Sequence, residues 1–452
     1  MIPGHELVGR ALAAATVEET IVIVTDSSEA SLRWAGNSMT TNGISTLRRW
    51  TVVSIVRDSS GARVGTVSST SVDPEDIDAV VKAAETAAGA AGLAEDAMPL
   101  ITGDGVPASW DAPSERTSID VFASLTGGLA SGFDGADTLY GFAHHQIETV
   151  WLGSSTGLRK RYTQPTGSVE INGKRGDASA WVGAGTPLFG DIAIEKLLVE
   201  LSARLDWAST SIELPAGRYE TILPPSAVAD LMIYLMWTME GRGAEEGHTA
   251  LSRAGGTRIG EKLGRLPLTL YSDPRAAGLE YSPFIATGSS NDSVSLFDNG
   301  MPTSRVDWIK GGVINALAYP RFAAERFNAH VTVPGDNLIL TGADAGIDDM
   351  IARTERGLLL TTLWYIREVD PTTLLLTGLT RDGVYSIQDG RVIGAVNNFR
   401  FNESPLDLLR RVTEAGATQP TLPREWKDWF TRTAMPPLRI PDFHMSSVSA
   451  AQ

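Results

Sequence analysis

The chain has 452 residues, of which 42% are hydrophobic, and a formal net charge of −16. A single core does not serve a chain of this length, so we expect two domains, or three at most. The acidic balance argues against a nucleic-acid backbone as the main partner, because phosphate binding needs clustered Lys and Arg. The chain contains no cysteine, which excludes disulfides and thiolate metal ligands.

The sequence shows neither a membrane span nor a signal peptide. No apolar run approaches the length of about 18 residues that a membrane span needs. The first residues, MIPGHELVGRAL, lack the basic segment followed by an apolar segment that marks a signal peptide. We therefore expect a cytoplasmic protein.

The first half of the chain predicts a strand meander accompanied by helices. The best-defined helix begins after Asp73, because an N-cap residue is followed there by Pro74 and by acidic residues in the first turn. Residues 95–118 are expected to form a loop. The other expected helices cover residues 5–15, 119–129 and 192–206, and the expected strands cover residues 20–25, 30–34, 50–56, 63–68, 145–152, 158–163, 167–172 and 179–182.

The second half of the chain predicts strands around one apolar helix. Residues 210–219 are expected to cross between domains, and Ser226 is expected to cap a helix that runs to about Glu240. This helix is apolar all round, which indicates that it is buried. The tail from Pro420 is expected to pack across the surface. Strands are expected at residues 268–271, 294–297, 313–319 and 338–340.

Residues 356–402 predict the centre of the C-terminal domain. Four strands are expected there, at 358–366, 374–379, 383–387 and 392–396. Asp389-Gly390 is the strongest hairpin signal in the chain. The first of the four strands is almost unbroken apolar sequence and must be covered on both faces. The sequence therefore predicts an α+β fold with a sandwich-like N-terminal domain at residues 1–212 and a domain rich in antiparallel sheet at residues 213–452.

Catalytic motifs are hard to find in this sequence. The H-E-x-x-H, G-x-S-x-G, Walker and G-x-G-x-x-G motifs are absent. His144 and His145 are adjacent, so in a strand they point to opposite faces and cannot share a metal. Glu245, Glu246 and His248 follow a glycine in a loop beyond the apolar helix. They are candidates for a metal site or an acid–base pair, or they form a solvated loop.

The order of several segments resembles the TldD/PmbA family, peptidases once called modulators of DNA gyrase. The likeness spans nearly the whole chain and ends in the meander at residues 356–402. Each segment alone is a weak signal, but their order over the full length is informative. The segments are GNSMTTNGISTLRRW, GARVGTVSSTSVDPEDIDAVVKAA, SSTGLRKRYTQPTGSVEINGK, LPAGRYETILPPSAVADLM, RIGEKLGRLPLTLYSDP and DNGMPTSRVDWIKGGVINALAY.

The resemblance implies a pair of related subunits. In that family a TldD subunit carries H-E-x-x-x-H on a helix and a later cysteine, which hold a zinc that cleaves peptides. Its partner, PmbA or TldE, has a similar fold but lacks these ligands, and the two enclose a peptide channel. The corresponding helix here is Ala227–Glu240, with Met236 and Trp237 in the region of the metal motif. The chain therefore resembles the PmbA/TldE-type partner, without a cofactor, catalytic residues or metal ligands of its own and with zinc in the other subunit.

Three functions follow as hypotheses. The first is a non-catalytic subunit that guides unstructured or modified peptides to a TldD-type partner. The second is an autonomous metallopeptidase with an atypical metal site, and the third is a homodimeric peptide-binding protein without proteolytic activity. Strand addition suits such peptide binding, because backbone hydrogen bonds carry little sequence preference. The peptide-contact candidates lie in the loop and in the apolar strand, the latter being also explained as plain core: Arg242, Glu245, His248, Leu359, Thr361, Leu363 and Tyr365.

Overall fold

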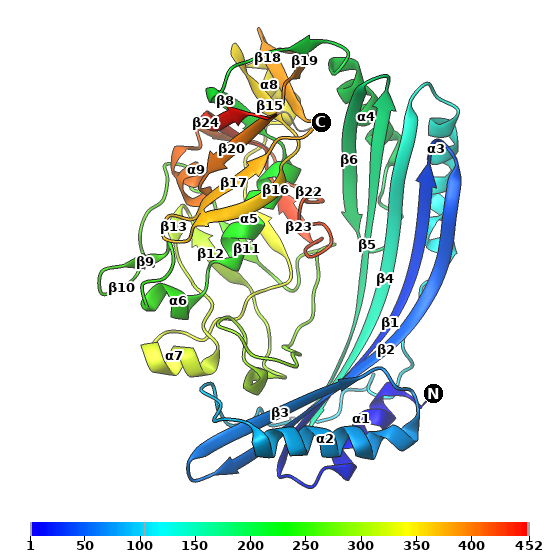
Figure 1. Cartoon of the computed structure of the whole chain (residues 1–452), viewed down its shortest axis with the longest axis vertical. Helices are drawn as coiled ribbons and strands as arrows, with labels where there is room; N and C mark the ends of the chain where they lie inside the picture. Colours follow the sequence, from blue (N-terminus) through cyan, green and yellow to red (C-terminus); the bar gives the residue numbers. More distant parts are fainter. Residues whose placement is uncertain (1, 104, 450–452) are drawn as a thin grey trace.

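A computed structural model describes residues 2–103 and 105–449 and shows the predicted α+β fold. A long, curved antiparallel sheet forms the N-terminal part of the molecule (Figure 1). The C-terminal part, built from two larger sheets around a buried helix, lies against one face of this long sheet. The candidate site lies at the interface between these two parts.

The N-terminal sheet has six strands in the order β3-β2-β1-β4-β5-β6. Alternate side chains of these strands point to opposite faces. One face is apolar and is covered by helices that include α3 (Ala123–Phe133) and α4 (Ile194–Trp207). The other face is turned toward the C-terminal part: it is polar where Lys427 binds it, and apolar where β1, β2 and β4 pack against Phe284 and Phe297. The strands are β1 (Glu19–Ala35), β2 (Met39–Asp58), β3 (Gly61–Ser69), β4 (Thr138–Ser154), β5 (Arg159–Arg175) and β6 (Ala178–Thr186).

The predicted helices of this part are present. Asp73 accepts a hydrogen bond from the Glu75 backbone N–H, as its N-cap role predicts, and a 3-10 turn at Pro74–Asp76 leads into α2 (Ile77–Ala90). Helix α1 (Gly4–Ala14) packs beside it against the sheet. The segment expected at 119–129 is a 3-10 turn at Ile119–Phe122 followed by α3 (Ala123–Phe133), and α4 spans Ile194–Trp207.

Two expected breaks in the sheet are wrong. The strands predicted at 20–25 and 30–34 are one strand, β1, because β2 and β4 pair with it through the polar residues between them. The strands predicted at 158–163 and 167–172 are likewise one strand, β5. Pro165 does not interrupt β5. Strand β6 pairs with β5 only from Gly167 onward, so on that side no N–H is required from the proline.

His145 is buried on one face of this sheet, whereas His144 points to the opposite face, as their adjacency predicts. The His145 Nε2 lies 2.8 Å from the Pro187 carbonyl oxygen, so it carries the proton, and Nδ1 accepts the Thr117 hydroxyl at 2.6 Å. Burial lowers the pKa of His145; its hydrogen bond to Pro187 opposes this effect, and the neighbouring His144 adds to it.

Acidification should therefore destabilise the fold through His145. A histidine whose folded-state pKa is lowered contributes stability above the unfolded pKa of about 6.5, and this stability is lost as the pH falls below that value. Unfolding in urea at pH 7.5 and at pH 5.5 should show a larger loss for the parent chain than for His145→Gln. Equal losses in the two proteins would contradict this account.

The C-terminal part contains a ten-stranded and a six-stranded sheet. Helix α5 (Pro225–Trp237) lies in the main core, which draws side chains from both sheets. The ten-stranded sheet contains β7 (Ser211–Ile212), β8 (Gly217–Leu223), β15 (Arg356–Leu360), β16 (Trp364–Asp370), β17 (Leu375–Leu379), β18 (Val384–Gln388), β19 (Arg391–Val396), β20 (Phe399–Glu403), β21 (Glu414–Ala415) and β24 (Leu438–Val448). The six-stranded sheet contains β11 (Leu270–Ser272), β12 (Val306–Lys310), β13 (Val313–Ile314), β14 (Leu338–Leu340), β22 (Gln419–Thr421) and β23 (Thr433–Met435).

Short elements complete this part of the chain. The strand predicted at 294–297 is wrong: a 3-10 turn at Leu296–Asp298 occupies this place, with the Ser295 hydroxyl accepting the Phe297 N–H. The strand predicted at 313–319 is only the two residues of β13. The other elements are α6 (Gly241–Glu245), β9 (Ser252–Arg253), β10 (Gly256–Thr257), α7 (Arg321–Phe327), α8 (Ile347–Ala352) and α9 (Pro405–Arg411).

The central meander has more strands than predicted. Its first expected strand, 358–366, is divided into β15 and β16, which lie apart in the ten-stranded sheet. Strand β15 pairs with β8 and β18, whereas β16 pairs with β17. The predicted hairpin at Asp389-Gly390 is confirmed, and both residues have the positive φ that this turn requires.

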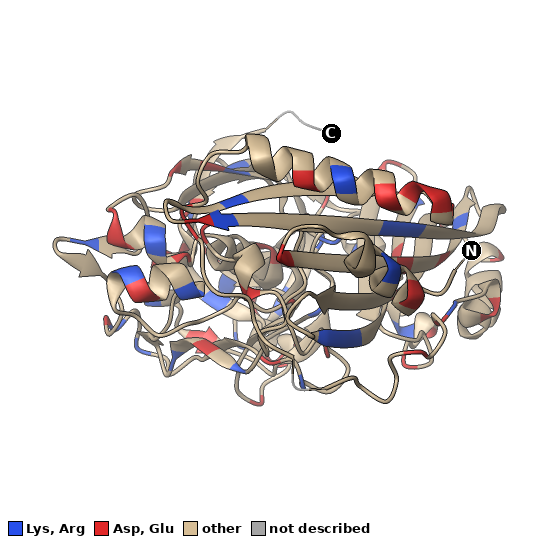
Figure 2. Ribbon diagram, turned by 90° about the horizontal axis from the view of Figure 1, so that it is seen from below, with Lys and Arg blue, Asp and Glu red and all other residues tan. Residues whose placement is uncertain are grey.

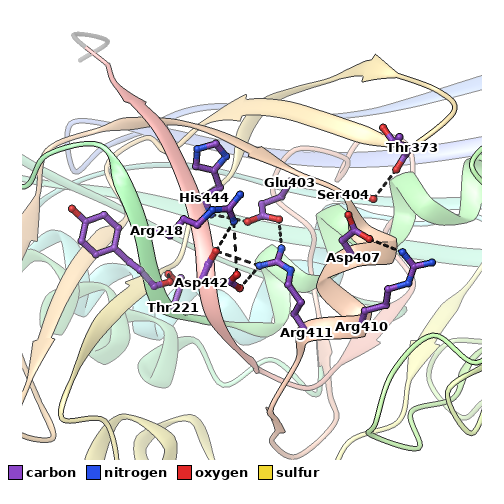
Figure 3. A network of polar contacts seen from close by, with 11 residues as sticks. Arg218, Thr221, Thr373, Glu403, Ser404, Asp407, Arg410, Arg411, Asp442 and His444 are labelled. Atoms are coloured by element: carbon purple, nitrogen blue, oxygen red, sulfur yellow. Dashed lines mark hydrogen bonds and ion pairs between the residues drawn. The ribbon is translucent and has the colours of Figure 1, made fainter.

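The C-terminal tail does not pack across the surface, contrary to expectation. Strand β24 lies inside the ten-stranded sheet, between β20 and β8. Charged side chains fasten it there: Arg411 of α9 contacts both Glu403 of β20 and Asp442 of β24, and the His444 backbone N–H donates to Glu403 (Figure 3). The tail is therefore part of the core.

The sequence expectation places the domain boundary directly after residue 212. Strand β7 ends there, and it pairs with β19 of the ten-stranded sheet. A division into domains at this residue stays a prediction. Among the described residues no helix is long and apolar enough to cross a bilayer. Basic side chains are interspersed with acidic ones along the ribbon (Figure 2).

Candidate functional site

Helix α5 and the loop between β22 and β23 form the framework of the site. The helix begins after Pro224, with Pro225 as its first residue, so the cap is not Ser226 as predicted. Its buried, mostly apolar side chains explain its place in the core. Asp230 is the exception. This fully buried carboxylate accepts backbone N–H groups from Arg424, Glu425 and Trp426, and so fixes the loop on the helix.

Aromatic rings gather where α5 ends. Trp426 lies 4.9 Å from Trp237 and 5.8 Å from Tyr234 between ring centroids, and its indole N–H donates to the Asp230 backbone carbonyl. Trp237 is 44% exposed although it is the last residue of a buried helix. An exposed indole held by two other rings is a rigid apolar contact surface.

Arg424 extends this surface toward the N-terminal sheet. Its guanidinium lies 5.4 Å from the ring centroid of Trp181 on β6 and 5.7 Å from that of Trp364 on β16. Burial lowers the pKa of Arg424, with opposing contributions from nearby carboxylates. We call these aromatic residues and the arginine the aromatic–arginine cluster: Trp181, Tyr234, Trp237, Trp364, Arg424 and Trp426.

The sheet face beside the cluster is polar. Lys427 of the loop binds Glu170 of β5 at 2.9 Å, which holds the loop against this face. Farther along the same face, Gln146 donates to the Ser27 hydroxyl, and the His144 Nε2 lies 3.8 Å from a Glu29 carboxylate oxygen. Burial raises the pKa of Glu148, which neighbouring charges both oppose and reinforce. The cluster thus adjoins a strip of hydrogen-bonding side chains.

The structure separates the residues of the predicted apolar strand. Leu359, Thr361 and Leu363 are at most 3% exposed, in agreement with their alternative interpretation as core. Tyr365 is 56% exposed, has a positive φ, and its ring lies 4.2 Å from the Arg367 guanidinium carbon. Peptide contact by these four residues stays a prediction, and only Tyr365 presents a side chain to solvent.

The predicted loop residues belong to a charged group around α6. Arg242 forms ion pairs with Glu95, Glu246 and Asp292. Glu245 accepts the Tyr319 hydroxyl at 3.0 Å, and the His248 side chain is 70% exposed. The His248 Nδ1 lies 3.8 Å from a Glu246 carboxylate oxygen. The Glu245 and Glu246 carboxylates also have other partners, Tyr319 and Arg242 respectively. Peptide contact by Arg242, Glu245 and His248 stays a prediction.

The side chains around α6 and the end of α5 are not suited to binding a metal. No group of three or more His, Asp or Glu side chains in the described part of the chain has the arrangement of a metal site. On α5 the side chains nearest its end, Met236 and Trp237, offer neither an imidazole nor a carboxylate. A catalytic zinc needs three such ligands and an open position for water. In the part of the chain that the structure describes, the side chains around the end of α5 therefore do not fit a catalytic zinc.

Sequence comparison gives the family. Residues 216–447, more than half of the chain, match the model of the PmbA/TldA metallopeptidase C-terminal domain. The chain belongs to the PmbA/TldD family. A comparison with curated protein sequences finds no significant match.

Solved structures share the whole PmbA/TldD fold with this chain. TldE from Thermococcus kodakarensis aligns with a TM-score of 0.79 at 17% identity, over 97% of this chain and 98% of that one. A candidate modulator of a DNA gyrase from Thermotoga maritima gives a TM-score of 0.77 at 14% identity, covering 97% and 99%. A similar candidate modulator from Bacteroides thetaiotaomicron gives 0.79 at 14% identity, covering 98% of each chain. At these identities the likeness concerns the fold.

The sequence interpretation missed most of the cluster. Trp181 lies more than 240 residues before Arg424 and Trp426, and no local pattern links it to them. The one available signal was Trp237, a large aromatic residue at the end of an otherwise core-forming helix.

Proposed function

We propose that this chain is the non-catalytic subunit of a cytoplasmic two-subunit zinc metallopeptidase, binding unstructured or modified peptides for cleavage by a TldD-type partner. The aromatic–arginine cluster carries the proposal. It lies at the end of α5, the helix that corresponds to the metal-binding helix of the catalytic subunits, and it offers binding surface in place of metal ligands. The metallopeptidase family of the chain and its fold, shared with a TldE, support the same assignment.

The chemistry of the cluster suits a peptide chain. The exposed Trp237 ring offers an apolar contact that accepts many side chains. The polar face of the N-terminal sheet, with Gln146 and Ser168 among its side chains, offers hydrogen-bonding groups to a peptide main chain. Such contacts give affinity with little sequence preference, as expected of a subunit that handles flexible peptides.

Loss of the exposed indole should weaken peptide binding. Anisotropy of a fluorescein-labelled, unstructured ten-residue peptide should show at least tenfold weaker binding to Trp237→Ala, since a central aromatic contact contributes about 2 kcal/mol. Val199→Ala, which shortens an exposed apolar side chain on α4, is the control and should bind like the parent. Unchanged binding by Trp237→Ala would place the peptide elsewhere.

A further inference from the structure

Arg424 is a cation with an incomplete set of partners. Its Nη1 donates to the Thr362 hydroxyl at 3.1 Å, and its two other contacts are the faces of Trp181 and Trp364. Within the described residues no carboxylate lies at ion-pair distance from it. A partly desolvated guanidinium without a carboxylate is costly to a fold, and such groups are found where a ligand supplies the missing charge.

The carboxylates that surround Arg424 are occupied or too distant. Asp230 accepts three backbone N–H groups of the loop, and Glu170 binds both Lys427 and the Trp181 indole N–H. Asp382 attracts Arg424 electrostatically but makes no ion pair with it. The guanidinium therefore retains N–H groups without a protein acceptor.

A second arginine lies nearby. Arg381 is exposed and its guanidinium carbon lies 5.8 Å from the same Trp364 ring centroid. It too has no carboxylate at ion-pair distance among the described residues, and it repels Arg424 electrostatically. In a chain with a net charge of −16, Arg424 and Arg381 thus place two guanidinium groups without a carboxylate partner around one indole. This arrangement favours an anionic ligand.

We propose that Arg424, with Arg381 beside it, binds the C-terminal carboxylate of an extended peptide. The planar guanidinium matches a carboxylate through two parallel hydrogen bonds. Trp181 and Trp364 flank Arg424, so they exclude water from this pair and contact the last side chain of the peptide. The inference rests on the proposed peptide binding and adds a direction to it, since the C-terminus is fixed at Arg424 and the preceding residues extend toward Trp237.

The test compares three labelled peptides of one sequence on the full chain. The first has a free C-terminus, the second a C-terminal amide, and the third an amide together with an internal glutamate. The free acid should bind at least tenfold more tightly than the amide, because a charge-assisted pair is lost on amidation. The glutamate peptide should bind like the plain amide.

Variants assign the effect to the arginines. Arg424→Gln should reduce the preference for the free acid to less than about twofold, and Arg424→Lys, which keeps the charge but not the fork, should retain part of it. Arg381→Gln should reduce the preference partially. The matched control is Arg305→Gln, since Arg305 also stacks on an aromatic ring, Tyr271, but is already paired with Asp307. This control should keep the full preference.

Equal binding of acid and amide by the parent chain would overturn the carboxylate site but leave peptide binding intact, and this comparison needs no variant. Recovery of tight binding by the internal glutamate would overturn the assignment to the C-terminus. A preference that survives in Arg424→Gln would overturn the role of Arg424. Failure of all three peptides to bind would overturn the proposed function and this inference together.

Discussion

Replacing Asp230 by leucine should lower the free energy of unfolding by about 3 kcal/mol, because it leaves buried backbone N–H groups without an acceptor. Asp230 lies inside α5 and accepts the N–H groups of Arg424 and Trp426 at 3.3 and 3.4 Å and that of Glu425 at 3.0 Å. Leucine has a similar size but no acceptor. Urea unfolding followed by circular dichroism measures the loss.

Asparagine at the same position separates hydrogen bonding from charge. Burial raises the pKa of Asp230, although the loop N–H groups oppose this rise. The raised pKa means that the ionised form is poorly accommodated, so the stability from this group decreases as the pH rises through its folded-state pKa. Asp230→Asn keeps one acceptor oxygen without a charge and should cost less than Asp230→Leu. If the two variants are equally stable, the loop does not depend on this acceptor.

Removing the guanidinium of Arg321 should have a comparably large effect, about 3–5 kcal/mol, because it leaves a buried carboxylate unpaired. Asp298 is 0% exposed, and its carboxylate accepts from the Arg321 Nε at 2.5 Å and from the Arg321 backbone N–H at 3.1 Å. The same guanidinium donates to the Pro99 carbonyl at 2.9 Å. Arg321 thus ties the segment that follows α2 to the C-terminal part of the molecule.

A double variant tests the cause of this loss. Arg321→Met alone should be strongly destabilised in thermal unfolding, whereas Arg321→Met with Asp298→Asn should recover part of the stability, since no charge then remains buried. The control is Arg10→Met, which removes an exposed ion pair to Glu6 on α1 and should change stability by less than about 0.5 kcal/mol. No recovery in the double variant would show that lost packing, and not the unpaired charge, causes the instability.

Local signals in the sequence predict the elements that depend on neighbouring residues. Helix α2 follows from Asp73 and Pro74, and the hairpin between β18 and β19 follows from Asp389-Gly390. The burial of α5 follows from its composition, and the α+β class from the alternation of strands and helices. The family resemblance adds the order of the elements over the whole length.

Elements that form only through pairing between distant segments cannot be predicted from local sequence signals. Residues 39–47 of β2 contain Asn-Gly and are exposed, yet they form strand because β1 pairs with them along their length. Strand β24 contains Pro441 and Asp442 and reads as tail, but β8 and β20 enclose it. The aromatic–arginine cluster could not be predicted for the same reason. Its members are brought together by the hydrogen bonds of the loop to Asp230 and by the contact between the loop and the sheet.

The most direct measurement is the metal content and peptide hydrolysis of the purified chain, alone and mixed with a TldD-type partner. A non-catalytic peptide-binding subunit should carry no stoichiometric zinc and show no hydrolysis alone, and hydrolysis of unstructured peptides should appear in the mixture. Stoichiometric metal and turnover by the lone chain would contradict the account and favour an atypical metal site. A stable homodimer that binds peptide but never gives hydrolysis with the partner would also contradict it, in favour of a binding protein without proteolytic activity.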